Sequence, residues 1–357
     1  MPLWAGEGDL PTPAFIRQAA AEALLRGETF YTWQRGIPEL REALARYHNR
    51  HFSTELNSQN FLVTGSGMQS ILLALQAVAG DGDEVVYLTP AWPNFAAAAG
   101  IAGSRAVSVN LDFGPTGWTL DVSRLERSLN GKTKAIFINS PSNPTGWTAN
   151  AEELSAILDI ARKNGLWIIA DEIYALFYYG SERSASFLDV MEPDDKIIFV
   201  NSFSKNWAMT GWRVGWLCTH PSLAQVFENL IQYSTSGVAQ FMQRGAVVAL
   251  DGGDEFIQMQ VRRARQARDL LCQALESTGK VRLAAPEGAF YLFFAIDGIK
   301  DSMAAALSMV DHAGIGIAPG IAFGKEAEGY FRICFNRSID EIQLASERLV
   351  SWINDHA

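Results

Sequence analysis

The sequence is poor in cysteine and carries fewer basic than acidic residues. Its 357 residues include 3 cysteines, Cys218, Cys272 and Cys334, with no CxxC pair. A disulfide framework or a cysteine metal site is therefore not expected, and we predict a protein of the reducing cytoplasm with no bound metal. Lys and Arg number 29 against 39 Asp and Glu, a formal net charge of −10. This balance disfavours nucleic acid as a partner, because binding to phosphates depends mainly on Lys and Arg.

Membrane spans and export signals are also missing from the sequence. No uncharged apolar run reaches the ~18 residues that a transmembrane helix needs, and the first ten residues contain neither a basic nor an apolar segment. Apolar residues make up 48% and charged residues 19%, which is typical of a compact globular chain. The length is about twice the roughly 150 residues of a typical domain, so it predicts two domains and a small-molecule site.

Short apolar runs alternate with helical patterns from about residue 60 onward. Asn150 is the expected N-cap of a helix over residues 151–164, with Glu153 three residues later and Gly165 as its stop. This alternation predicts an α/β fold whose central sheet is mostly parallel and covered by helices. Ligands of such sheets bind beyond the carboxyl ends of the strands. Five runs without polar alternation are the predicted buried strands: 61–64, 84–88, 135–138, 166–170 and 196–200.

The two ends of the chain differ from this central part. The first 50 residues combine a loop with two helices, the second of which opens at Pro38. After residue 257 come a long helix with a basic face, which most simply is a solvated surface, strands near 281–295 and 330–335, and a last helix from about Asp340. We expect both ends to join into one smaller α/β domain. The predicted division is a large domain of residues 46–257 and a small discontinuous domain of residues 1–45 and 258–357.

Small and polar residues follow the predicted strands. The segment TGSGMQ (64–69) opens a helix with bare backbone amides, a favourable place for a phosphate. As a dinucleotide-binding fingerprint it is incomplete, since the third glycine and the later acidic residue are missing. Trp92 and Asn143 follow the next two strands in the chain. Taken alone, Trp92 would more often be a core residue, and turn chemistry explains Asn143 about as well as a binding role does.

An acid and an amine follow the last two of these strands. Asp171 ends a buried run, where a carboxylate without a cationic partner is costly, although a helix N-cap would also explain it. Lys205 lies among hydroxyl groups, and burial with a nearby cation such as Arg213 would make it a nucleophilic amine. Alone it would more often be an exposed loop lysine. A phosphate cradle, a flat aromatic ring, an amide, a buried acid and an activated lysine together indicate pyridoxal 5′-phosphate.

The string SFSKNWAMTGWRVGW (202–216) resembles the lysine motif of the fold-type I, class I and II aminotransferases, the aspartate aminotransferase superfamily. The resemblance implies a large domain like that of the pyridoxal phosphate-dependent transferases. It also implies a ping-pong transfer of an amino group between an L-amino acid and a 2-oxo acid through a lysine aldimine. Further matching blocks follow in the family's order over nearly the whole chain: AGEGD (5–9), YTWQRGIPELREAL (31–44), VTGSGMQS (63–70), NSPSNPTG (139–146), ADEIY (170–174), PEGAFYLF (286–293), GIGIAPGIAFG (314–324) and FRICFN (331–336).

The resemblance implies catalytic roles for three residues and ring-binding roles for two more. Lys205 would be the Schiff-base lysine and the proton shuttle, and Asp171 would pair with the pyridine nitrogen. Tyr174 and Asn143 would hydrogen-bond the ring oxygen, while Trp92 would stack on the ring.

The same resemblance implies residues for the phosphate and the substrate. Tyr31 would reach the phosphate across a dimer interface, which implies a homodimer with shared active sites. Arg332 would bind the substrate α-carboxylate in a bidentate manner, helped by Asn143 and the backbone of Gly6. The other phosphate ligands would be the backbone of Gly67 and Met68 with the side chains of Ser202, Ser204 and Arg213.

Departures from the family pattern leave the substrate open. The family usually has a longer segment ahead of the AGEGD block, including an arm that grips the partner subunit, so the strength of the dimer stays open. A second arginine for a dicarboxylate cannot be placed, although Arg35 lies near the relevant loop, and aspartate specificity is therefore not predicted.

Other functions are weighed against the same residues. A lyase, a decarboxylase or a cyclising enzyme on this fold is the first alternative; Trp92 favours a transaminase, since cyclising relatives commonly have tyrosine there. A non-catalytic sensor domain of a transcription regulator would need a DNA-binding module ahead of residue 5. A dinucleotide-dependent oxidoreductase is rejected, because Lys205 and Asp171 would then have no role.

Overall fold

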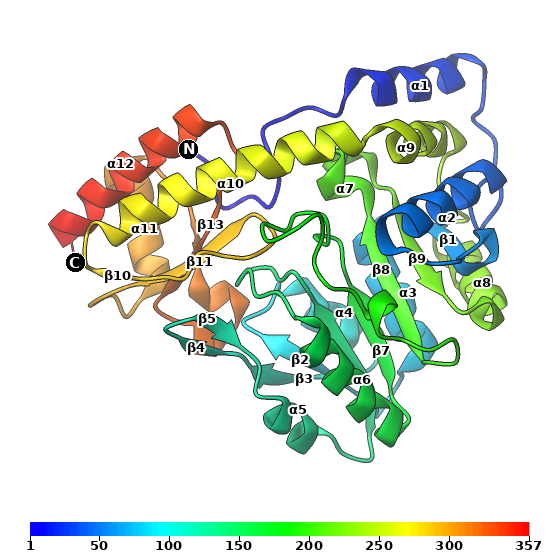
Figure 1. The fold of residues 1–357 in the computed structure, drawn as a ribbon, viewed down its shortest axis with the longest axis horizontal. Coiled ribbons are helices and arrows are strands. Elements are labelled where there is room, and N and C mark those ends of the chain that lie inside the picture. Colours follow the sequence, from blue (N-terminus) through cyan, green and yellow to red (C-terminus); the bar gives the residue numbers. More distant parts are fainter. Residues whose placement is uncertain (357) are drawn as a thin grey trace.

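The computed structural model describes residues 1–356. Its centre is a seven-stranded sheet in the order β1-β9-β8-β7-β6-β2-β3 (Figure 1). Neighbouring strands are parallel except β9, which is antiparallel to both β1 and β8. All five predicted strands are present, and the prediction of a mostly parallel sheet is confirmed. The strands are Phe61–Thr64 (β1), Glu84–Thr89 (β2), Arg105–Asn110 (β3), Thr133–Asn139 (β6), Trp167–Asp171 (β7), Ile197–Ser202 (β8) and Gly215–Thr219 (β9).

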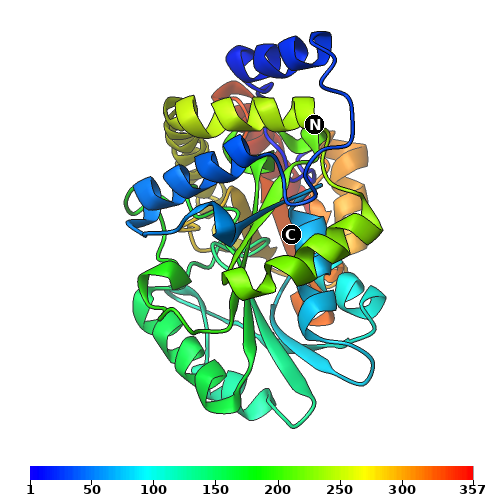
Figure 2. The same ribbon diagram turned by 90° about the vertical axis from the view of Figure 1, so that its right-hand side faces the viewer.

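Helices cover both faces of this sheet, which therefore lies between two apolar layers (Figure 2). Alternate residues of each strand enter opposite layers: Leu62 packs in one and Val63 in the other. This double burial explains why the strands lack polar alternation. One layer contains α3 (Gly67–Val78), α4 (Asn94–Ile101) and α8 (Ala224–Ser234); the other contains α2 (Pro38–Phe52), α5 (Val122–Ser128), α6 (Ala151–Asn164) and α9 (Gln240–Gly252).

Helix α6 begins and ends where the sequence predicts. Oδ1 of Asn150 accepts from the amide of Glu153 at 2.9 Å, and the Glu153 carboxylate accepts from the amide of Asn150 at 3.0 Å. Gly165 ends the helix with φ 65°. A reciprocal cap at one end and a left-handed glycine at the other fix the length of the helix.

A second, antiparallel sheet lies toward the C-terminus in the order β10-β11-β13-β12. The first residues of the chain join it, since the amide of Leu3 donates to Gly316 at 2.8 Å and the amide of Cys334 donates to Leu3 at 2.9 Å. Its strands are Val281–Arg282 (β10), Tyr291–Ile296 (β11), Ala318–Pro319 (β12) and Tyr330–Cys334 (β13), next to the helices Asp254–Glu276 (α10), Ser302–Ala313 (α11) and Ile339–His356 (α12); a small hairpin, Asp112–Gly114 (β4) and Gly117–Thr119 (β5), completes the strands.

Both predicted domain boundaries fall inside helices, at residues 45/46 in α2 and 257/258 in α10. Helices α1 (Ala14–Leu25) and α2 pack against α9, on the side of the large sheet (Figure 1). The division into two domains stays a prediction, and we propose that its N-terminal boundary lies ahead of α1.

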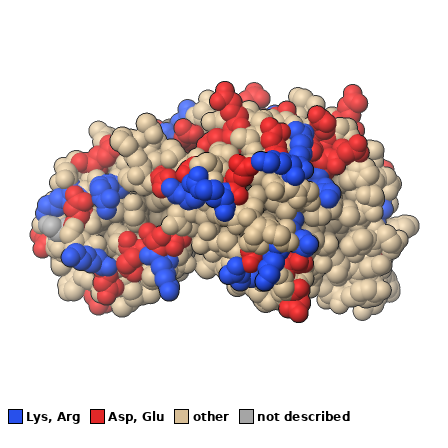
Figure 3. Space-filling model, turned by 90° about the horizontal axis from the view of Figure 1, so that it is seen from below, with Lys and Arg blue, Asp and Glu red and all other residues tan. Residues whose placement is uncertain are grey.

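The basic face of α10 is only partly solvated, so that interpretation was wrong for two of its residues. The guanidinium of Arg263 donates to Asp9 at 2.6 Å, and that of Arg268 lies 4.5 Å from the ring centroid of Tyr179. On the face seen in Figure 3, basic and acidic side chains of residues 1–356 are interspersed and form no continuous basic stripe. Among residues 1–356, no helix is both long enough and apolar enough to span a membrane.

Candidate active site

A cavity of about 360 Å³ lies where the carboxyl ends of the central strands face the C-terminal sheet. This is the position that the alternation of strands and helices predicts for a ligand. Seven predicted site residues line it. The full lining is Trp4, Gly6, Trp92, Asn139, Asn143, Asp171, Ile173, Tyr174, Lys205, Tyr291 and Arg332.

Asp171 is the last residue of β7 and is only 4% exposed. Its carboxylate accepts one hydrogen bond, from the amide of Ile173 at 3.3 Å, and forms no ion pair with any residue from 1 to 356. Burial raises the pKa of this carboxyl to about 7, although that amide and the nearby ammonium of Lys205 both favour the charged form. A cationic group entering the cavity would relieve this cost.

Lys205 lies in the one-turn helix α7 (Phe203–Asn206), directly after β8. Its Nζ donates to the carbonyl of Gly6 at 2.6 Å. Burial lowers the pKa of the ammonium to about 8, while the charge of Glu7 acts in the opposite direction and those of Arg332 and Arg213 lower it further. A substantial fraction of this amine is therefore neutral near pH 8.

The start of α3 offers unpaired backbone amides. Oγ of Ser66 accepts from the amide of Gln69 at 3.0 Å, whereas the amides of Gly67 and Met68 have no acceptor within residues 1–356. A Cβ on Gly215 in β9 would lie 2.6 Å from the carbonyl carbon of Ser66 and 2.7 Å from the nitrogen of Gly67. Glycine is therefore required for β9 to approach the start of this helix.

Two buried hydroxyls lie beside these amides. Oγ of Ser202 accepts from the amide of Ser204 at 3.1 Å and donates to its Oγ at 2.9 Å. A Cβ on Gly67 would lie 3.3 Å from Cβ of Ser202, so the start of α3 and the start of α7 are in contact. Helix N-termini with free amides and hydroxyls favour an anion.

None of the six predicted phosphate ligands is in the cavity lining, and two of them, Arg213 and Tyr31, are exposed. Arg213 is exposed and its guanidinium donates to the carbonyl of Thr210 at 2.6 Å, although its charge is close enough to lower the pKa of Lys205. Tyr31 is 92% exposed. Its predicted role across a dimer interface stays a prediction.

Arg332 in β13 is buried and carries an unused donor. Its Nη1 donates to Oδ1 of Asn143 at 2.9 Å and its Nη2 to the carbonyl of Trp4. The guanidinium lies over the rings of Tyr291 and Phe323, at 4.6 and 4.9 Å from their centroids. Its buried Nε has no partner, and no carboxylate within residues 1–356 pairs with it. A buried cation with an unused donor and no carboxylate is suited to bind an anionic ligand.

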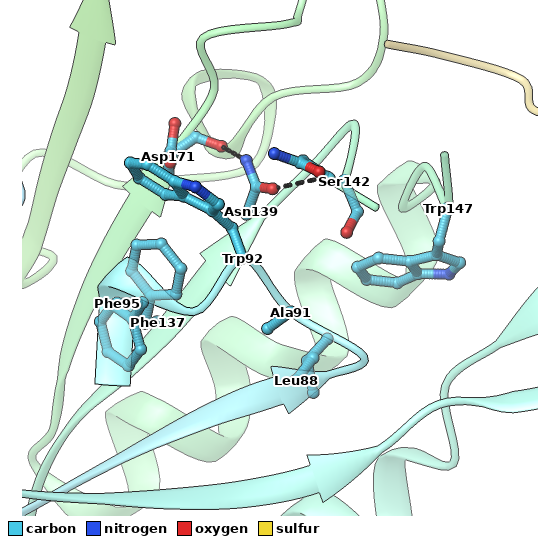
Figure 4. Close-up of a pocket in the computed structure, with 10 residues that line it drawn as sticks. Leu88, Ala91, Trp92, Phe95, Phe137, Asn139, Ser142, Trp147 and Asp171 are labelled. Atoms are coloured by element: carbon cyan, nitrogen blue, oxygen red, sulfur yellow. Dashed lines mark hydrogen bonds between the residues drawn. The ribbon is translucent and has the colours of Figure 1, made fainter. Parts of the chain in front are cut away.

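Asn139, at the end of β6, was not predicted as a site residue. Its side chain donates to the carbonyl of Asp171 at 3.2 Å and accepts from the amide of Asn143 at 2.9 Å, while the ring of Trp92 lies beside them (Figure 4). The side chain of Asn139 thus links the backbone of Asp171 to the backbone of Asn143. Its position directly after the predicted strand 135–138 was the available signal.

Tyr291 and Trp4 were also missed. The hydroxyls of Tyr174 and Tyr291 are 2.8 Å apart, and burial raises the pKa of Tyr174 well above its usual range. A Cβ on Gly6 would lie 2.6 Å from the Tyr291 hydroxyl, so glycine is needed there. Within the apolar string YLFFAI, Tyr291 looks like an ordinary core residue.

The sequence model of the family "Aminotransferase class I and II" matches residues 1–349. This chain belongs to the class I and II aminotransferase family. The aspartate aminotransferase of Thermotoga maritima is 34% identical over 352 residues, which are 99% of this chain and 91% of the relative. The aspartate/prephenate aminotransferase of Thermus thermophilus is 32% identical over 97% of this chain and 89% of the relative. The solved structure of the aromatic aminotransferase from Pyrococcus horikoshii has a TM-score of 0.93 at 32% identity, covering 99% of this chain and 96% of that one.

The predicted family, fold class and transaminase activity are therefore confirmed. The family uses pyridoxal 5′-phosphate, and its members exchange amino groups between amino acids and 2-oxo acids. The lyase, sensor and oxidoreductase alternatives are not favoured by any of these matches.

Proposed function

We propose that this aminotransferase binds pyridoxal 5′-phosphate in the cavity and uses Lys205 to move the α-proton of the substrate. One observation carries the proposal: the cavity contains a buried acid, Asp171, and a half-buried amine, Lys205, that form no ion pair with each other or with another residue from 1 to 356. Opposite charges in one cavity normally pair. Their separation leaves room for a ligand with a basic nitrogen for the acid and a carbonyl group for the amine.

The cofactor, when bound, supplies an aldehyde that takes up the amino group and a ring that withdraws electrons from the substrate α-carbon. Asp171 would hold a proton on the ring nitrogen, because its own buried charge needs a cation. Trp92 would stack on the ring, and Asn143 with Tyr174 would bind the ring oxygen. The phosphate would be held by the amides of Gly67 and Met68 and by Ser202, Ser204 and Arg213.

Arg332 would orient the substrate through its α-carboxylate. The hydrogen bond to Asn143 and the two flanking rings fix the plane of the guanidinium before substrate arrives. A fixed plane reduces the entropy lost when a bidentate pair forms. Asn143 and the backbone of Gly6 would complete this carboxylate site.

Lys205 would accept the α-proton at Nζ and return it during the same half-reaction. This needs a neutral amine within reach of the substrate, and burial provides it by lowering the pKa to about 8. The carbonyl of Gly6 orients the amine at one side of the cavity.

The proposed enzyme is a cytoplasmic homodimer with shared active sites. Tyr31 is 92% exposed in a segment where Phe30 and Trp33 are 82% and 62% exposed, which suits a surface covered by a second copy. The three cysteines are free and buried, which fits a reducing compartment.

Product analysis of the purified protein with pooled amino acids and 2-oxo acids tests this function. Keto-acid exchange together with a visible absorbance band on addition of the cofactor is the expected result. Ammonia release without exchange would instead assign a lyase, and absence of the band would contradict cofactor binding.

A further inference from the structure

The cavity has a cation for one carboxylate only. Among residues 1–356, the basic side chains that line it are Lys205 and Arg332. Lys205 is needed as an amine, so Arg332 alone remains to pair with a substrate anion. An amino acid with a second carboxylate would have to bury that charge without a partner, which is costly.

Arg35, the other arginine considered for this role, is held elsewhere. Its Nη2 donates to the carbonyl of Gln59 at 3.0 Å and its Nη1 to Oε1 of the same residue at 3.3 Å. It does not line the cavity of its own chain. Glu7 and Arg213 are both close enough to change the pKa of Lys205, but their charges are opposite and neither residue lines the cavity.

Apolar residues are part of the cavity lining together with Arg332. Trp4 is part of the cavity lining, and its carbonyl accepts a hydrogen bond from the guanidinium of Arg332. The ring rests against the backbone of Gly316, where a Cβ would come within 2.1 Å of it. Trp4 therefore stands next to the carboxylate-binding group, and Ile173 adds further apolar lining.

We propose that the enzyme prefers amino donors with a single carboxylate and an apolar, above all aromatic, side chain, and that the indole of Trp4 determines this preference. The inference rests on the proposed function and concerns the same site. The proposed donor differs from aspartate, the dicarboxylate after which several relatives are named. Removal of the ring would weaken binding of an aromatic side chain without touching Arg332 or Lys205.

The test compares donors in a single half-reaction, so that no dicarboxylate acceptor is present. The holoenzyme is mixed with L-phenylalanine or with L-aspartate alone, and the change in the cofactor spectrum gives kcat/KM for each donor. We expect phenylalanine to exceed aspartate by about tenfold or more, and Trp4→Ala to lower this ratio by about tenfold, as for other side-chain pockets. Trp4→Phe should keep most of the ratio. Phe15→Ala, which removes a ring exposed to a similar degree outside the cavity, should leave it unchanged.

Binding without turnover gives a second readout. Calorimetric titration of the holoenzyme should show tighter binding of 3-phenylpropionate than of maleate, and Trp4→Ala should reduce that difference. Faster reaction with aspartate than with phenylalanine would overturn the inference. If Arg35→Ala then abolished the preference for aspartate, Arg35 would be the cation that pairs with the side-chain carboxylate. An unchanged ratio in Trp4→Ala would overturn the role of the indole. Failure of every donor to change the spectrum would contradict the proposed function instead.

Discussion

Arg332 and Asn143 join the two sheets of the molecule through one hydrogen bond. Nη1 of Arg332, in β13 of the C-terminal sheet, donates at 2.9 Å to Oδ1 of Asn143, in the loop after β6 of the central sheet. The same loop is tied to Asp171 through Asn139. The group proposed for the substrate carboxylate is therefore positioned by the residues proposed for the cofactor ring.

Replacement of Arg332 by lysine should raise KM for every amino donor by roughly 10- to 100-fold. Lysine would lose one of the two hydrogen bonds to the substrate carboxylate, and it lacks the fixed plane of the guanidinium. Arg337→Lys, a few residues further along the chain, is the matched control and should change KM by less than about twofold. Steady-state kinetics with two unrelated donors would check this. Equal effects of both variants would contradict the assignment of Arg332.

Gly215→Ala should weaken cofactor binding and lower stability by about 1–3 kcal/mol, since the new methyl meets the backbone of Ser66 and Gly67. Gly211→Ala is the control, because a Cβ there meets no atom within 4 Å. Fluorescence titration with the cofactor and thermal unfolding without it would measure the two effects. Unchanged cofactor affinity in Gly215→Ala would argue against a phosphate site at the start of α3.

The rate at which the cofactor-free protein captures the cofactor should rise with pH, with a midpoint near 8. Only the neutral amine of Lys205 is nucleophilic, and burial lowers its pKa to about 8. Glu7→Gln should move the midpoint to lower pH, because the charge of Glu7 raises this pKa. Stopped-flow absorbance between pH 6 and 10 would measure both. A rate that does not change over this range would contradict a buried amine.

Asp171→Asn should stabilise the cofactor-free protein at pH 8 more than at pH 5. The pKa of Asp171 is about 7 in the folded state and near 3.9 in the unfolded state, so folding takes up a proton between these values. The loss of stability caused by burying the charged carboxylate grows as pH rises from about 4 to 7 and reaches its full value above pH 7. Removal of the charge should raise Tm at pH 8 by roughly 2 °C or more.

The same variant should bind the cofactor weakly, because the ring nitrogen loses its anionic partner. Calorimetric unfolding at both pH values, with and without the cofactor, would test the pair of effects. A lower Tm at pH 8 in the absence of the cofactor would show that Asp171 is stabilised by the protein itself.

Local sequence predicted the parts of the site that follow strands. Asp171, Lys205 and Asn143 each come after an apolar run, and the carboxyl ends of parallel strands meet at one edge of the sheet. The cap of α6 was predictable for a similar reason, since Asn150, Glu153 and Gly165 act within a few residues of one another.

Contacts between distant segments could not be predicted in this way. Strand β9 is antiparallel to both neighbours because the chain turns back after α7, and Gly215 can be understood only once β9 touches the start of α3. Trp4 and Tyr291 are ordinary apolar residues in the sequence. Tyr291 meets Arg332 because β11 pairs with β13, and Trp4 meets it because the neighbouring Leu3 bonds to Gly316 and Cys334.

The identity of the lysine that holds the cofactor is the measurement that tests the central claim most directly. The holoenzyme is reduced with borohydride, denatured and digested, and the peptides are analysed by mass spectrometry. We expect the mass of the phosphopyridoxyl group on the peptide that contains Lys205, its absence in Lys205→Ala, and its retention in Lys196→Ala, which removes an exposed lysine just ahead of β8. The same modification on another lysine, or full turnover in Lys205→Ala, would contradict the proposed mechanism.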